Sequence, residues 1–124
     1  VYATEPGADP VGEWLESCAG FQPLARADHL VLPGHKLPFT GLPDRLRHLI
    51  DNHHGALQRL CDHLANGPFS AVECFAPLFK REIDEGSYGL ALVEAVAHLN
   101  HLLAQGAVAR VRRADGAWAY HLAR

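Results

Sequence analysis

The sequence predicts a mainly α-helical fold class, in which three helices are followed by a β-hairpin. Apolar residues recur at three- and four-residue steps over residues 43–65, and residues 88–105 are apolar around most of a helix. Ser70 and Glu73 have the spacing of a capping box directly before another apolar run. Further along, apolar residues alternate on both sides of Asp115-Gly116, which is typical of two strands joined by a tight turn.

Two shorter elements are expected before the first long helix. Asp9 can cap a helix over residues 10–19, because its side chain can accept a hydrogen bond from the first turn and Pro10 suits the first helical position. The apolar run at residues 29–32 is too short for a helix and predicts a short buried strand. Residues 33–43 contain three prolines and two glycines, so an ordered loop is expected there.

The first long helix is predicted over residues 43–65. Pro43 is tolerated in its first turn, and Asn66-Gly67-Pro68 ends it. His53 falls on its apolar face, where we expect a hydrogen-bonded core histidine. The capping box then predicts a helix over residues 71–79.

The third helix is predicted over residues 88–105 and ends at Gly106. Its few polar residues form one stripe, which we expect to face solvent: Glu94, His98, His101 and Gln105. Three helices and a hairpin in this order are typical of a winged helix-turn-helix domain, to which residues 43–124 are assigned.

Bulk composition excludes several classes of protein. The chain has 124 residues, of which 48% are hydrophobic and 20% charged, as in an ordinary globular protein of about one domain. A formal net charge of -3 argues against general attraction to nucleic acid or to an anionic membrane. No apolar run approaches the ~20 residues of a membrane span, and we recognise no signal peptide. The three cysteines form no C-x-x-C pair, which indicates free thiols in a reducing compartment, so a cytoplasmic location is expected.

A winged helix often reads DNA, but the sequence argues against that role here. A reading helix needs side chains such as Arg or Lys in the major groove, and residues 88–105 contain neither. The basic residues gather instead on the hairpin, at Arg110, Arg112 and Arg113. Two interpretations stay open for them, an exposed strand face or a weak contact with RNA or phosphate, and nucleic acid is the less expected partner.

The stretch Val31-Leu32-Pro33-Gly34-His35 places a histidine in a loop directly after a short apolar run. Pro33 and Pro38 stiffen this loop, and zinc prefers a neutral imidazole that is held rigidly. By itself, His35 is compatible with a metal ligand and with a loop histidine of no special function.

Taken together, Pro33-Gly34-His35, Pro38-Phe39, the long helix and the hairpin tail resemble the C-terminal portion of metallo-β-lactamase-fold hydrolases. The similarity is to the glyoxalase-like and endoribonuclease-like branch, which carries an appended winged-helix domain. It implies that residues 1–42 are the C-terminal end of an αββα catalytic sandwich and that His35 binds a metal, usually zinc. It also implies that Lys36, Phe39 and Thr40 line the rim of the substrate cleft.

The other metal ligands of that family do not occur in this chain, namely an H-x-H-x-D-H motif, a further histidine and a bridging aspartate. The chain also lacks methionine and opens at Val1, so we interpret it as the C-terminal part of a longer protein. The resemblance implies that this protein is a zinc-dependent hydrolase, in which two zinc ions activate water against an ester, thioester or phosphodiester. One imidazole cannot form a tight zinc site, so the chain alone is expected to be inactive. Its expected partner is the missing N-terminal catalytic part, with a homodimer as a second option.

Two hypotheses from other classes remain. The first is a winged-helix regulator or protein-interaction module that never belonged to an enzyme. The second is a small metal-sensing repressor, which would need clusters of Cys or His on helices that this chain does not supply. His98 and His101, one helical turn apart, could chelate a metal weakly, but a solvated polar stripe is the expected account of this pair.

Overall fold

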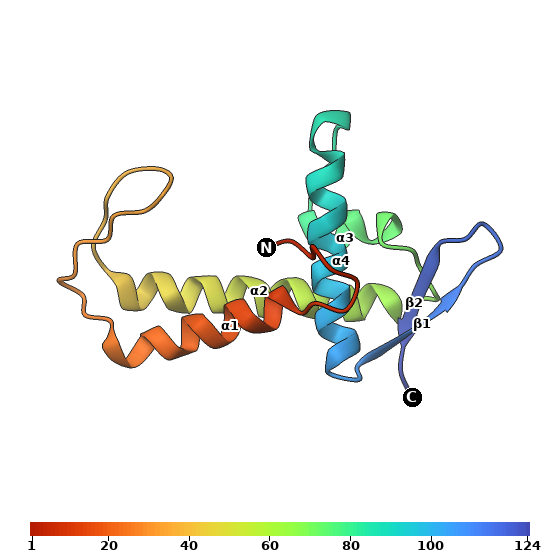
Figure 1. Cartoon of the computed structure of the whole chain (residues 1–124), viewed down its shortest axis with the longest axis horizontal. Helices are drawn as coiled ribbons and strands as arrows, with labels where there is room; N and C mark the ends of the chain where they lie inside the picture. The colour runs from red at the N-terminus through yellow and green to blue at the C-terminus, as the bar shows by residue number, and fades with distance from the viewer.

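The computed structural model describes all of residues 1–124 and confirms a mainly α-helical fold with one small sheet (Figure 1). Its helices and strands are α1 (Pro10–Phe21), α2 (Leu42–Leu64), α3 (Phe75–Phe79), α4 (Tyr88–Ala104), β1 (Val108–Arg112) and β2 (Trp118–Leu122). Three short 3-10 turns lie between them: η1 (Gln22–Leu24), η2 (Val72–Cys74) and η3 (Glu85–Ser87). None of the helices is both long and apolar enough to cross a membrane.

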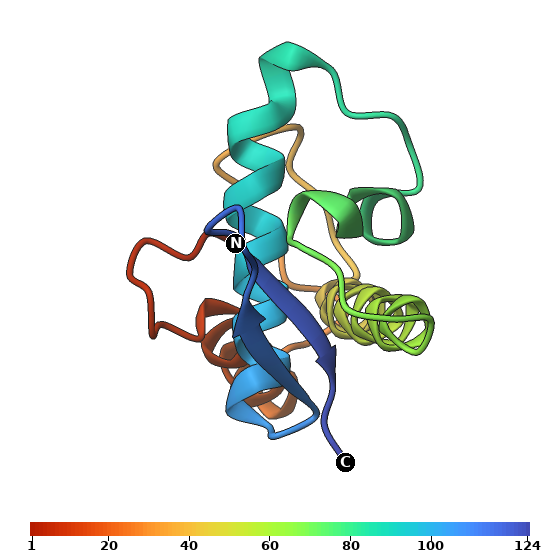
Figure 2. The same ribbon diagram turned by 90° about the vertical axis from the view of Figure 1, so that its right-hand side faces the viewer.

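The molecule has a compact part and a projection. α1 and the first half of α2 lie side by side and extend away from the crossing of α2 and α4, with the loop between them at the far end (Figure 1). We call this projection, residues 14–50, the arm. Figure 2, in which α2 is seen nearly end-on, shows the hairpin in front of α4 and α3 beside α2.

The hydrophobic core lies where α2, α3, α4 and the hairpin meet. Leu60 of α2 and Leu99 of α4 are fully buried there, together with Val11 of α1 and Cys74 of η2. Burial of each leucine stabilises the fold by about 1.5–3 kcal/mol relative to an exposed position. This cluster holds the compact part together, while Cys18 and Leu46 are buried separately in the arm.

The cap predicted at Asp9 is present. The backbone N–H of Gly12 donates to Asp9 Oδ1 at 2.9 Å, and α1 then buries Val11 and Cys18 on one side. The capping box is also confirmed, because Ser70 N donates to Glu73 Oε1 at 2.8 Å. The helix predicted over residues 71–79, however, is divided into η2 and the short α3.

All three cysteines are free thiols, as the sequence predicted. Cys18 and Cys74 are buried, whereas Cys61 is partly exposed. Burial raises the pKa of the Cys74 thiol to about 11, so this side chain stays protonated and unreactive at neutral pH.

The prediction of a solvated polar stripe on α4 is wrong. His98 and His101 are only 3% and 7% exposed. The His98 ring lies against that of His53 on α2, whereas residues 1–9 fold over the side of α4 that carries His101. Asn100 Nδ2 donates to the backbone oxygens of Pro6 and Ala8 at 3.3 and 3.0 Å. His101 Nδ1 lies 3.0 Å from the carboxylate of Asp9, which connects the start of α1 to α4.

The prediction of a short buried strand at residues 29–32 is also wrong. Val31 forms only an isolated bridge with Phe39, and Leu30 and Leu32 are 66% and 74% exposed. A strand needs a neighbour along its length and a layer over its face, and this chain supplies neither for the segment.

The hairpin is confirmed with a regular antiparallel register, in which Arg110 lies opposite Tyr120 and Arg112 opposite Trp118. Phe69 and Tyr120 exchange two backbone hydrogen bonds of 3.0 and 2.8 Å, which attach the outer edge of β2 to the loop after α2. The order of helices and hairpin agrees with a winged helix-turn-helix. That assignment, and the domain boundary between residues 42 and 43, stay predictions.

Candidate functional site

His35 stands at the tip of a closed loop on the arm. Val31 and Phe39 exchange two backbone hydrogen bonds of 2.8 and 3.1 Å, which close the loop at its base. The next residue, Lys36, has a φ of 68°, a left-handed conformation that is uncommon for a residue with a side chain. The His35 side chain is exposed and has no hydrogen-bond partner within the chain, so its imidazole is free for an outside contact.

A cavity of about 510 Å³ opens between this loop, α1 and α2. His35, Lys36 and Phe39 line it from the loop, and Trp14 and Arg45 line it from the two helices. Thr40, which the family resemblance places on the same rim, does not line this cavity. The structure therefore brings three of the four predicted residues together, and their roles stay proposals.

The donor set around His35 does not make a complete metal site. Zinc in proteins takes three or four ligands from His, Cys, Asp or Glu. No group of three such side chains in this chain is arranged to hold a metal ion. His35 alone does not form a metal site, and no reaction step through a metal follows from these residues.

The surface around the His35 loop is unusually apolar. Five large apolar side chains of the arm are mostly exposed: Phe21 (59%), Leu24 (70%), Leu30 (66%), Leu32 (74%) and Leu37 (82%). Single exposed leucines are common on soluble proteins, but five large exposed apolar side chains on one projection make the arm a strongly apolar surface.

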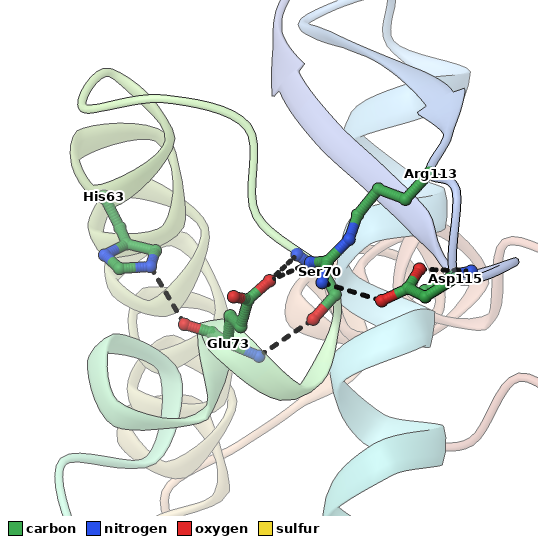
Figure 3. A network of polar contacts seen from close by, with 6 residues as sticks. His63, Ser70, Glu73, Arg113 and Asp115 are labelled. Carbon is green, nitrogen blue, oxygen red and sulfur yellow. Dashed lines mark hydrogen bonds and ion pairs between the residues drawn. The ribbon is translucent and has the colours of Figure 1, made fainter.

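The three basic residues predicted on the hairpin divide into two groups. Arg113 is occupied by carboxylates, because its guanidinium pairs with Glu73 and lies 2.8 Å from Asp115 (Figure 3). The hydrogen bond with Glu73, followed by the charge of Asp115, raises the pKa of Arg113. The backbone N–H of Ser70 is the largest cause that lowers the pKa of the Glu73 carboxyl.

The other two hairpin arginines stack on an aromatic ring. The guanidinium carbons of Arg110 and Arg112 each lie 4.3 Å from the centroid of the Trp118 ring. Such cation–π contacts are worth about 0.5–1 kcal/mol at exposed positions. They hold both guanidiniums in place without neutralising their charge.

The remaining histidines near the core have structural contacts. His98 Nδ1 donates to the backbone oxygen of Glu94 at 2.8 Å, and His53 Nδ1 donates to that of Leu49 at 3.0 Å. The two rings are nearly parallel, with centroids 5.5 Å apart. Burial lowers the pKa of His98 to about 4, so this imidazole is neutral at physiological pH. The hydrogen bond expected for His53 is present, and its side chain is half-buried.

Sequence reasoning missed the groups that join distant segments. Asp9 was recognised as a helix cap, but no local pattern pairs it with His101, from which it is 92 positions away. The contact of Arg113 with Glu73 spans 40 positions and is likewise invisible to helical or strand periodicity. The only sequence signal near this contact was the group of arginines on the hairpin, which does not identify Glu73 as a partner.

Comparisons with known proteins agree with the fold and with the sequence resemblance. Residues 57–123 match a family model described as the metallo-β-lactamase-like C-terminal domain. A β-lactamase domain protein from Burkholderia ambifaria has a similar solved structure, with a TM-score of 0.91 and 35% identity over 99% of this chain. A metallo-β-lactamase family protein from Thermus thermophilus matches 92% of this chain, with a TM-score of 0.74 and 27% identity. No match was found among curated proteins.

The solved relatives are much longer than this chain, which covers 36% of the first and 34% of the second. The family match and the coverage of nearly the whole chain by the first relative confirm the resemblance drawn from Pro33-Gly34-His35 and the helical tail. The chain belongs to the metallo-β-lactamase-like C-terminal domain family.

Proposed function

We propose that the chain is the C-terminal part of a zinc-dependent hydrolase of the metallo-β-lactamase fold, in which His35 supplies one metal ligand. The observation that carries this proposal is the free imidazole of His35, held at the tip of a closed loop on an arm that the chain leaves uncovered. The remaining ligands would come from a preceding catalytic part of the same protein.

The apolar arm supports the same partner. Covering each of its exposed leucines would contribute about 1.5–3 kcal/mol, so an uncovered arm forgoes several kcal/mol of stabilisation. This chain covers only 36% and 34% of the two solved relatives. A remainder of that size in the longer protein would be enough to form a layer over the arm. We infer that the preceding catalytic part packs on the arm and joins the His35 loop from one side.

When bound, zinc would activate a water molecule for attack on an ester, thioester or phosphodiester. The residues of this chain would position ligands and substrate. His35 would coordinate the metal through its imidazole ring. Lys36 lines the same cavity and would attract an anionic substrate, while Phe39 and Trp14 exclude water from one wall.

The direct test is the substitution His35→Ala in the longer protein that contains this chain. We expect the zinc content to fall by about one ion per protomer, and hydrolysis of thioester, phosphodiester and lactam test substrates to fall by at least about 100-fold. Metal analysis and steady-state kinetics measure both quantities. The matched control is His48→Ala, an exposed histidine on the same arm, which should change neither.

The isolated chain should not turn over any of these substrates, with or without added zinc, because it contains too few ligands. Unchanged zinc content and activity in the His35→Ala protein would refute the proposed role of His35. Zinc-dependent turnover by residues 1–124 alone would refute the proposal that the remaining ligands lie outside this chain.

A further inference from the structure

The hairpin carries two positive charges that nothing in the chain neutralises. Arg110 and Arg112 occupy alternate positions of β1, so both side chains leave the same face of the strand. Both guanidiniums lie against Trp118, and neither forms an ion pair with a carboxylate. The one polar contact of this pair is that of Arg112 Nη1 with the backbone oxygen of Gly116, at 3.1 Å.

The nearby carboxylates are already in use. Glu73 and Asp115 both contact Arg113, and Glu73 also accepts the backbone N–H of Ser70 (Figure 3). Residues 105–124 contain four arginines and a single aspartate, although the whole chain has a net charge of -3. Arg113 therefore keeps the local acids away from Arg110 and Arg112, which leaves a local positive patch.

An apolar groove lies beside these charges. Trp118 also lines a cavity of about 210 Å³, together with Val72 of η2 and Leu92 and Val96 of α4. Val72 and Trp118 are 40% and 36% exposed, so this groove is open to ligands. A flat apolar group can enter it while an attached anion meets the guanidiniums.

We propose that this hairpin groove binds single-stranded nucleic acid, with backbone phosphates on Arg110 and Arg112 and a base against Trp118 and the apolar wall. The planar guanidinium pairs well with phosphate, and bases stack on aromatic rings and on guanidinium planes. An acidic peptide would satisfy the charges but has no flat group for the groove. A duplex is disfavoured, because α4 has no Arg or Lys to enter a major groove.

This inference goes beyond the proposed hydrolase function and does not depend on it. It also narrows the set of basic residues predicted from the sequence, since Arg113 is held by Glu73 and Asp115 and is excluded from the site. Arg110, Arg112 and Trp118 are the binding residues.

The test uses Trp118 as its own reporter. In the Trp14→Phe protein, Trp118 is the only tryptophan, and a uridine oligonucleotide of RNA should quench its fluorescence. Two phosphate contacts to a single strand predict a slope of about -1.4 for log K against log salt. Affinity should therefore fall about sevenfold between 50 and 200 mM salt.

Three variants should change the affinity for RNA, two of them downwards and one upwards. Arg110→Gln and Arg112→Gln should each weaken binding roughly five- to tenfold at low salt and reduce the slope by about 0.7. Glu73→Gln keeps a capping-box side chain but removes a negative charge beside Arg113, so it should strengthen binding. Arg47→Gln is the matched control, because it makes the same change of net charge near the start of α2. That end of α2 points away from the hairpin (Figure 1).

Several results would overturn the proposal. These are an absence of quenching at 50 mM salt, an equal loss of affinity in the Arg47→Gln control, or a salt slope that Arg110→Gln and Arg112→Gln leave unchanged. Polyglutamate of equal charge, or anionic lipid vesicles, should bind at least about tenfold more weakly than the RNA. Equal binding of either one would instead assign the patch to an acidic protein or to a membrane surface.

Discussion

His98 is a base that the fold keeps neutral. It is almost completely buried, and the groups around it that can carry positive charge are His53 on α2, His101 on α4 and the amino group of Val1. Burial, more than these neighbours, lowers its pKa from 6.5 to about 4. The unfolded chain therefore binds a proton at His98 between these two pH values, whereas the folded chain does not.

This difference predicts acid sensitivity. The free energy of unfolding should decrease as pH falls from about 6.5 towards 4, and the full effect of His98 amounts to roughly 3 kcal/mol. His98→Leu should remove this part of the pH dependence, which urea unfolding between pH 5 and 7 measures. His54→Gln, at an exposed position of α2, should keep it. The same pH dependence in the His98→Leu protein would contradict the assignment.

At the scale of single elements, α3 depends on a side chain from another helix. It has five residues, which is too short to be stable alone. Arg59 of α2 donates to the backbone oxygens of Pro77 and Leu78 at 2.8 and 3.1 Å, and so satisfies carbonyls at the end of α3 that a helix leaves unpaired. This pairing fixes where η2 and α3 lie, and with them Glu73.

Arg59→Met should therefore destabilise the protein by about 1.5–3 kcal/mol, because it removes two charge-assisted hydrogen bonds and retains most of the apolar stem. Urea unfolding measures this loss, and faster amide hydrogen exchange in α3 would locate it. The neighbouring Gln58→Met, which loses only a contact with Asp62 at the surface, should cost less than about 0.5 kcal/mol. Equal effects of the two substitutions would exclude the proposed support of α3.

At the scale of the whole molecule, the proposal that a preceding part of the protein covers the arm makes a prediction about its exposed leucines. We expect Leu32→Ser and Leu37→Ser to change the free energy of unfolding by less than about 0.5 kcal/mol, since both side chains are already mostly exposed. The same changes should lower the binding of a hydrophobic dye and any self-association seen by sedimentation.

Leu90→Ser is the matched control for the arm, because Leu90 is 58% exposed on α4, away from the arm. It should affect dye binding less than either arm substitution does. A large loss of stability in Leu32→Ser or Leu37→Ser would mean that these side chains already stabilise the isolated chain. That result would contradict the proposal that a preceding part of the protein covers them.

The sequence by itself determined the features that depend on near neighbours. The period of apolar residues located α2 and α4, and the short polar signals at Asp9 and at Ser70 with Glu73 located caps that the structure contains. The change to an alternating pattern around Asp115-Gly116 located the hairpin. These signals are readable because a helix turn, a cap and a tight turn each join residues that are only three or four positions apart.

Tertiary structure alone decided which polar groups are buried, paired or free. The burial of His101 follows from residues 1–9 folding over α4, and the difference between Arg113 and Arg110 follows from where Glu73 comes to lie. The exposure of Leu30 and Leu32 likewise depends on which layers the chain can supply, so a strand pattern was not enough to make a strand. Such contacts join positions tens of residues apart, and their free energies depend on the packing of whole elements, which no local period records.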